Sequence, residues 1–425
     1  MGAQGVTPRV HRLTNGVSVI CEPMAGLESF ALSVVAGRGA RQEPPERSGW
    51  SHLLEHMVFK GAGGRSAREI VEAIELKGGQ INAATGYERT SFQIRALQGG
   101  LELGLRTCAD LILRPALDAG ELEREKQVVG QEIAESEDTP DDHVFELAQA
   151  CAYAGQPLGR PILGEVPSVG AAQPKSLEAW RAGLYAPDRL VISASGAVDE
   201  DELLALAEDA FGPARGSEQP EPDPGRFTGG LLPERRRLEQ AHLVFLLPGP
   251  GARDAPYYVA RVFAEILGGG MSSRLFQEAR EKRGLAYSID AWAESYADTG
   301  MVGVYAGAAA ENAGPLADVV STEIKGLAGS VSPEELERAK AQLTARLLMA
   351  RESPLVRAEQ AAGQILLFGK LFSAREIAEG VEAVSAADVL ALGEQLLGQG
   401  QCVAAALGPA RAMAAPDRFQ RSLFN

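Results

Sequence analysis

The sequence has few cysteines, and none stands in a spacing that marks a metal or redox motif. Its 425 residues include four cysteines, and no two of them form a CxxC pair. The lack of such a pair argues against a metal or redox site built from cysteines. We therefore expect buried, reduced thiols at all four positions: Cys21, Cys108, Cys151 and Cys402.

Long hydrophobic runs are also missing. The longest apolar stretches, such as Val302 to Ala310, are far shorter than the roughly 20 residues that a membrane-spanning helix needs. The first residues, Met1 to Asn15, contain no apolar core and no cleavage-site pattern of a secretory signal. The sequence thus predicts a soluble, cytoplasmic protein without membrane association.

Basic residues are in deficit. There are 41 Lys and Arg residues against 57 Asp and Glu residues, which gives a formal net charge of −16. Nucleic-acid binding needs clustered positive charge, so this balance argues against a nucleic-acid partner, whereas basic or neutral peptides remain compatible with it. Apolar residues make up 45% of the chain, which is enough for substantial cores, and the length suggests two or three domains.

One segment near the middle lacks hydrophobic periodicity altogether. Residues 216–230 carry three prolines and four glycines among polar residues, a composition typical of linkers. This segment divides the chain into near-equal halves. We predict an N-terminal domain over residues 1–215, a linker over 216–236 and a C-terminal domain over 237–425.

The two halves resemble diverged copies of one unit. Residues 121–124 (ELER) recur as residues 335–338, and Pro140 matches Pro354 at the same offset of 214 residues (335 − 121 and 354 − 140). A near-constant offset over this distance indicates a long duplicated unit. The sequence therefore predicts two homologous domains.

Strands and helices are mixed within each half without strict alternation. In the first half, residues 29–36 and 90–96 have the pattern of strands, and residues 48–59 and 118–137 have the pattern of helices. Such a mixture favours an α+β fold in which helices cover one face of a mostly antiparallel sheet. We expect this architecture in both domains.

Two of the five histidines lie four residues apart on the predicted helix 48–59. At 3.6 residues per turn, His52 and His56 share one face of that helix, where two imidazoles can ligate a zinc ion. Glu55 projects near the same face and is placed to take a proton from the attacking water. The intervening apolar residues are expected to anchor the helix in the core: Leu53, Leu54, Met57 and Val58. The competing interpretation is a hydrogen-bonded histidine pair without a metal.

A catalytic zinc site needs a third protein ligand. The candidates are the other histidines, at positions 11, 143 and 242, and the carboxylates of the predicted helix 118–137. Glu125 and Glu132 lie seven residues apart, on one stripe of that helix. At the offset of 214 their counterparts are Ala339 and Arg346. The half without the histidine motif thus lacks this pair of acids, although a solvated acidic face is the simpler interpretation of either one.

These segments resemble the inverted zincins, the insulinase–pitrilysin–mitochondrial processing peptidase family. The likeness rests on three motifs of the first half: His52–Gly61 (H-x-x-E-H-M-x-F-K-G), Gly78–Thr85 (G-G-x-x-N-A-x-T) and Glu123–Ile133 with its spaced glutamates. It extends over nearly the whole chain. The implied fold is that of mitochondrial processing peptidase, with two homologous domains per chain.

The resemblance assigns roles to the candidate site residues. It implies one Zn²⁺ per chain, held by His52, His56 and Glu132. It implies Glu55 as the general base of a metallopeptidase. Glu125 matches the second acidic position of the family, which supports the site through a ligand.

The resemblance also implies residues that contact a substrate. Asn82 and Ala83 match a segment in which an edge strand takes up the substrate as an added strand, whereas the preceding glycines would also suit a turn. Arg280 and Tyr287 match a pair that reaches the substrate and suits a developing oxyanion; a surface arginine and a packed tyrosine are the alternative. Phe59 is a candidate for the pocket wall beside the zinc, or for the core.

By resemblance, the expected activity is zinc-dependent hydrolysis of peptides or unfolded segments in a closed chamber. Two-domain members of the family pair, and this chain carries both the zinc motif and the Arg/Tyr motif, so we expect a homodimer, with a heterodimer as the alternative. The competing functions are a non-catalytic structural subunit of the same family and a zinc hydrolase with a non-peptide substrate. The complete ligand set and the substrate motifs favour the peptidase.

Overall fold

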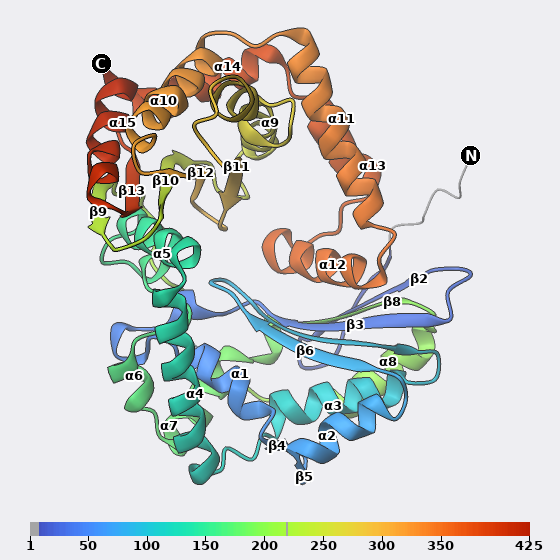
Figure 1. The fold of residues 1–425 in the computed structure, drawn as a ribbon. Helices are drawn as coiled ribbons and strands as arrows, with labels where there is room; N and C mark the ends of the chain where they lie inside the picture. The colour runs from blue at the N-terminus through green and yellow to red at the C-terminus, as the bar shows by residue number, and fades with distance from the viewer. Residues whose placement is uncertain (1–7, 218–219) are drawn as a thin grey trace. The chain divides into compact units, whose positions relative to one another are not determined.

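The computed structural model describes residues 8–217 and 220–425 (Figure 1). Residues 1–7 and 218–219, which include part of the chain start and of the predicted linker, lie outside the described residues. The chain divides into two compact units, each with its own sheet. Unit 1 comprises residues up to 134, 161–222 and 348–373, and unit 2 comprises residues 135–160, 223–347 and 374–425.

Unit 1 contains a six-stranded sheet in the order β1-β2-β8-β3-β7-β6. Neighbouring strands are antiparallel except β2 and β8, which are parallel, so the expected mostly antiparallel sheet is confirmed. The strands are β1 (Val10–Arg12), β2 (Ser18–Pro23), β3 (Ser29–Ala36), β6 (Gln80–Thr85), β7 (Thr90–Leu97) and β8 (Leu190–Gly196), and a separate short ladder pairs β4 (Gly61–Ala62) with β5 (Arg65–Ser66).

One face of this sheet is covered by helices from the first half of the chain, drawn below the sheet in Figure 1. Alternation along β3 explains the layer, because Leu32 and Val34 belong to the core shared with these helices and Val35 points to the opposite face. The helices are α1 (Trp50–Val58), α2 (Ala67–Glu75), α3 (Leu101–Leu113), α4 (Ala119–Asp138), α6 (Val166–Gly170), α7 (Pro174–Leu184) and α8 (Glu200–Phe211).

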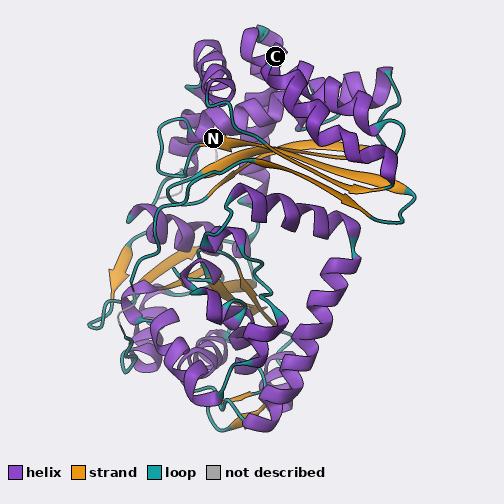
Figure 2. Cartoon of the chain, turned by 90° about the vertical axis from the view of Figure 1, so that its left-hand side faces the viewer, coloured by secondary structure: helices purple, strands orange, loops and turns teal. Residues whose placement is uncertain are grey.

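Unit 2 repeats this arrangement with a five-stranded sheet in the order β11-β12-β10-β13-β9, in which only β13 and β9 are parallel. Most of its helices gather on one side of the sheet, as Figure 2 shows. The strands are β9 (Gly230–Arg235), β10 (Gln240–Gly249), β11 (Ser288–Ser295), β12 (Gly300–Ala309) and β13 (Val403–Gly408). The helices are α9 (Tyr257–Gly268), a π-helix (Phe276–Lys282), α10 (Ala313–Gly329), α11 (Pro333–Ala350), α13 (Ala374–Glu382), α14 (Ala386–Gly398) and α15 (Ala415–Phe424).

Each unit also contains one helix from the other half of the chain. In unit 1, α12 (Pro354–Phe368) packs on the open face of the sheet, where Ala362 shares a buried cluster with Val35 and Val191. In unit 2, α5 (Pro140–Ala152) contacts β10 and β13. The two helices begin at the offset of 214 residues (354 − 140). α5 and α12 are therefore equivalent helices of the repeat, and each packs on the sheet that is formed mainly by the other half of the chain.

This exchange divides the chain differently from the predicted domain boundaries. The predicted domains over 1–215 and 237–425 would place residues 135–160 in the first domain and residues 348–373 in the second. In the structure, residues 135–160 belong to unit 2 and residues 348–373 belong to unit 1. The sequence pattern identifies the apolar side of each helix, but it does not reveal which of two similar sheets that side covers. The predicted linker over 216–236 also contains a regular element, because β9 lies within it.

The four cysteines are free; three are buried and Cys151 is half-buried, as expected for thiols that serve packing. Among the described residues, no helix is long and apolar enough to cross a membrane.

Candidate metal centre

The helix that carries both histidines, α1, begins at Trp50, where a buried carboxylate caps it. Glu43 is 2% exposed, and its two oxygens accept the backbone N–H groups of Gly49 (2.8 Å) and Ser51 (2.7 Å). Backbone N–H groups at the start of a helix have no partner within the helix. Glu43 therefore supplies the side-chain cap that Gly49, the N-cap residue, cannot provide. Gly49 has φ = 87°, a backbone conformation that favours glycine. A Cβ atom added at this position would lie 2.5 Å from the carbonyl oxygen of Leu163.

The apolar face of α1 holds the helix in the core and leaves its polar face available for chemistry. The four anchoring side chains predicted from the sequence are confirmed as fully buried: Leu53, Leu54, Met57 and Val58. Ser51 adds a polar contact, because its hydroxyl accepts the indole N–H of Trp180 at 3.2 Å. His52, Glu55 and His56 remain partly accessible.

The structure brings together His52, His56 and Glu132, the three residues predicted as ligands. One donor atom from each lies within 4.8 Å of the others. A Glu132 oxygen is 3.8 Å from His52 Nε2 and 3.6 Å from His56 Nε2. Ligands of a tetrahedral zinc with bonds of about 2.0–2.2 Å lie about 3.3–3.6 Å apart, so small side-chain movements fit this donor set to the ion. Residues 8–217 and 220–425 contain no second cluster of this kind.

The protonation of His52 also suits a metal. Burial, together with the neighbouring His56, lowers the pKa of His52 to about 4. Its imidazole is therefore neutral at physiological pH, which is the form that ligates a metal. The two rings stand edge to face with centroids 4.6 Å apart. His52 Nδ1 is buried and has no hydrogen-bond partner among the described residues.

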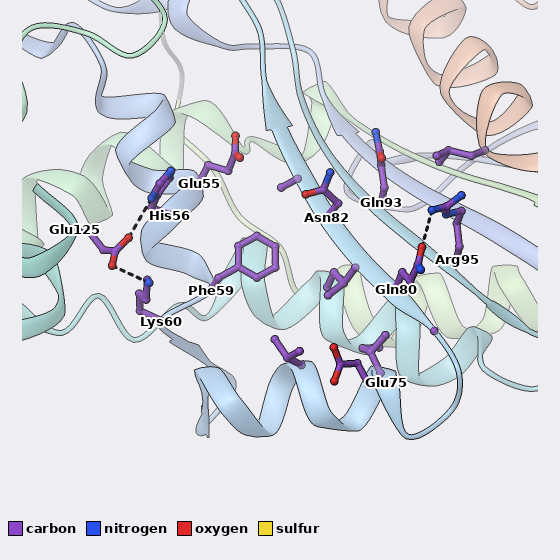
Figure 3. Close-up of a pocket in the computed structure, with 16 residues that line it drawn as sticks. Glu55, His56, Phe59, Lys60, Glu75, Gln80, Asn82, Gln93, Arg95 and Glu125 are labelled. Carbon is purple, nitrogen blue, oxygen red and sulfur yellow. Dashed lines mark hydrogen bonds and ion pairs between the residues drawn. The ribbon is translucent and has the colours of Figure 1, made fainter. Parts of the chain in front are cut away.

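Glu125 supports His56 on the side away from the cluster. It is 4% exposed, and one carboxylate oxygen lies 3.0 Å from His56 Nδ1. Because an ionised carboxylate only accepts, Nδ1 donates, and in the neutral tautomer with this donor Nε2 is available to a metal. The other oxygen pairs with the Lys60 ammonium at 2.7 Å, as Figure 3 shows. The buried charge of Glu125 is thereby compensated.

Glu55 is tied to strand β6. Its carboxylate accepts the hydroxyl of Thr85, the last residue of that strand, at 2.5 Å. Burial raises the pKa of Glu55, although the Thr85 hydrogen bond and the nearby His56 act in the opposite direction. A carboxylate with opposing influences of this kind, beside a pocket, is suited to accepting and releasing a proton.

A pocket of about 670 Å³ adjoins these residues and follows β6 (Figure 3). Glu55, His56 and Phe59 line it on one side, and Asn82 and Ala83 line it from β6. In the described sheet β6 pairs only with β7, so its outer edge offers backbone groups to a peptide. Asn82 lies within the strand rather than in a turn. Phe59 lines the pocket and also packs partly against the core.

Two predicted site residues lie in unit 2. Arg280 is in the π-helix, where its guanidinium stacks over the ring of Phe276. Tyr287 directly precedes β11 and is 60% exposed. Their contact with a substrate at the metal would join the two units, and it stays a prediction.

Three residues of the site were not assigned these roles from the sequence: Glu43, Lys60 and Thr85. Lys60 carried a signal, because it follows His56 by four residues, although it lies just beyond the C-cap of α1. The other two contact α1 from separate segments. Periodicity along the chain contains no information about such contacts.

Unit 2 has ordinary structural side chains where the repeat places the counterparts of the two acids. Arg346, the counterpart of Glu132, forms an ion pair with Glu265 of α9. Ala339, the counterpart of Glu125, is buried. An ion pair and a methyl group thus occupy the positions that serve the metal cluster in unit 1.

Glu125→Gln is expected to weaken zinc binding by about 10–100-fold. The amide lacks the charge that holds the His56 Nδ1 proton, and it leaves Lys60 unpaired. Competition with a fluorescent chelator measures the affinity. Glu121→Gln, on the same helix but in a surface pair with Arg124, is the matched control and should bind zinc like the wild type. Equal affinities of the two variants would contradict this role.

The chain is similar to known proteins over most of its length. Residues 18–166 match the family model described as insulinase (peptidase family M16), and residues 171–343 match the peptidase M16 inactive domain. A Bacillus subtilis protein that bears the name uncharacterized zinc protease YmxG is 36% identical over 388 residues, which are 90% of this chain and 94% of that protein. A Rickettsia bellii protein that bears the name uncharacterized zinc protease is 34% identical over 401 residues, which are 94% of this chain and 97% of that protein.

A solved structure is also similar. The crystal structure of a protease from Helicobacter pylori superposes with a TM-score of 0.88 at 20% identity, covering 95% of this chain and 100% of that chain. At this identity the likeness establishes the fold alone.

Proposed function

Because the chain belongs to the insulinase (M16) family of peptidases, we propose that it is a zinc-dependent endopeptidase or oligopeptidase of peptides and unfolded segments. The observation that carries this proposal is the cluster of His52, His56 and Glu132, with Glu55 beside it in a pocket along an edge strand. Three protein donors leave a position for a further ligand, which is the pattern of catalytic rather than structural zinc. The zinc-protease names of the relatives support the same metal and reaction.

The chain's own residues account for the proton transfers. Zinc, when bound, supplies a Lewis acid that polarises a carbonyl and makes water more acidic. Glu55 takes a proton from the attacking water and delivers it to the leaving amine, while Thr85 orients its carboxylate. Glu125 and Lys60 hold His56 in the tautomer that presents Nε2 to the cluster.

The substrate is proposed to bind as an added strand along β6. The open edge presents N–H and C=O groups at the spacing of an extended peptide. Asn82, Ala83 and Phe59 would contact this peptide, since all three line the pocket. Arg280 and Tyr287 of unit 2 are proposed to donate hydrogen bonds to the scissile carbonyl oxygen as it gains charge.

A homodimer that encloses the substrate in a closed chamber completes the proposal. The alternative is a catalytic subunit that needs a different partner chain. A non-catalytic structural role is disfavoured, because the donors, Glu55 and the Glu125–Lys60 support are all present. Light scattering on the purified chain separates a homodimer from a monomer that awaits another partner.

Metal content and peptide cleavage together test the proposed function. We expect one zinc per chain and cleavage of an unstructured peptide pool, with activity lost to a chelator and restored by added zinc. Zinc without any cleavage would favour a missing partner chain or a structural role. A chain that takes up no zinc from zinc-containing buffer would refute the central claim.

A further inference from the structure

The pocket beside the metal cluster extends onto both faces of strand β6. Successive side chains of a strand point to opposite faces. Asn82 and Gln80 are therefore exposed on the open face of the sheet, whereas Ile81 and Ala83 pack partly against the core on the helix face. A peptide added beside β6 would alternate in the same way. Neighbouring substrate side chains would enter different parts of the pocket.

The part on the helix face is mostly apolar but contains one carboxylate. Phe59, Val71 and Ile74 form apolar walls together with Ile81. Glu75, the last residue of α2, lines the same part of the pocket. Figure 3 shows its carboxylate on the side of α2 that faces Phe59.

The Glu75 side chain is exposed, and its carboxylate forms no hydrogen bond or ion pair with any described residue. The basic groups that line the pocket lie elsewhere. Lys60 is paired with Glu125 at 2.7 Å. Arg95 stands opposite Gln80 on β7 and donates to its side chain at 2.5 Å, so it belongs to the open face. The charge of Glu75 is thus left for a ligand.

We propose that the helix-face part of the pocket is a specificity subsite for a lysine or arginine side chain of the substrate, with Glu75 as its counter-ion. The methylene stem of a basic side chain packs on apolar walls while its charged end stays near the pocket opening, which matches Phe59 and Val71 leading to Glu75. An acidic side chain is repelled by the same carboxylate. The inference rests on the proposed peptidase function and names its substrates as peptides with a basic residue near the cleaved bond.

The charge of the whole chain acts in the same direction. A net charge of −16 favours the approach of basic peptides. That long-range attraction does not depend on one residue. The contribution of Glu75 is therefore a preference for a basic substrate residue at one fixed position relative to the cleaved bond. The long-range attraction alone gives only a general preference for basic peptides.

Cleavage of an unstructured, sequence-randomised peptide pool, read by mass spectrometry, tests this subsite. We expect Lys and Arg to be enriched at one fixed position beside the cleaved bond, with about a tenfold higher kcat/KM for Lys than for norleucine there. Glu75→Gln should bring this ratio close to one, and Glu75→Lys should favour Asp and Glu at the same position. Glu72→Gln, on the same helix, outside the pocket and paired with Arg68, should keep the wild-type preference.

A binding measurement separates failure of the subsite from failure of the proposed function. The Glu55→Gln chain is titrated with the preferred peptide carrying either Lys or norleucine at the selected position. If the wild type cleaves no peptide, a series of peptides that carry a single Lys at successive positions is titrated instead. Tighter binding of the Lys peptide that disappears on adding Glu75→Gln supports the subsite. Equal binding, or a preference that survives Glu75→Gln, overturns it, whether or not the wild type cleaves peptides.

Discussion

Glu55→Gln is expected to lower the rate of peptide hydrolysis by between about 10² and 10⁴-fold, while the chain keeps its zinc. The amide has nearly the size of the carboxylate and can still accept the Thr85 hydroxyl. It takes no proton from the attacking water, because an amide is not a base at neutral pH. kcat/KM on one defined peptide and the zinc content of the same preparation are measured together.

Glu72→Gln is the control for this variant. Glu72 lies on the exposed side of α2, where it pairs with Arg68, and its loss should leave both quantities unchanged. Full activity of Glu55→Gln would remove Glu55 as the general base. Loss of zinc from Glu55→Gln would instead assign it to maintaining the metal cluster.

His56→Ala and Glu132→Ala are each expected to lose both the zinc and the activity. Either change leaves two protein donors, which is one fewer than catalytic zinc sites use. A ligand present at 1,000 times its Kd stabilises the folded chain by about 4.1 kcal/mol. Added zinc should therefore raise the Tm of the wild type and leave the Tm of both variants unchanged. Thermal unfolding with and without zinc measures this directly.

His11→Ala serves as the matched control for the ligand variants. The ring of His11 pairs with Glu200 at the surface and is not part of the cluster. This variant should retain zinc and the zinc-dependent rise in Tm. Stoichiometric zinc in either His56→Ala or Glu132→Ala would remove that residue from the ligand set.

Contacts between neighbours along the chain could be predicted from the sequence. The spacing of His52 and His56 places both on one face of α1, because an α-helix repeats every 3.6 residues. The same periodicity identified the four apolar residues that bury the other face. It also predicted β3 and β7 within one residue, whereas β1 and β6 of the same sheet were not predicted from periodicity.

The choice between the two acids of α4 illustrates where this reasoning ends. Glu125 and Glu132 share one helical stripe, so periodicity leaves them equivalent, and only the family resemblance assigned Glu132 as the ligand. In the structure they approach different atoms of His56, with Glu125 beside Nδ1 and Glu132 facing Nε2. Which nitrogen each acid meets depends on how α4 packs beside α1.

The sequence by itself determined the repeat, most elements of each half and the chemical character of α1, since these depend on composition and on periodicity over a few residues. Only the tertiary structure decided which sheet α5 and α12 cover, that Glu43 caps α1, and that Glu75 lines a pocket without a partner. The physical reason is that such contacts join different structural elements, whether these are near in the chain, as Glu43 and α1 are, or far apart. Their distances follow from the packing of whole layers, and a local pattern carries no record of them.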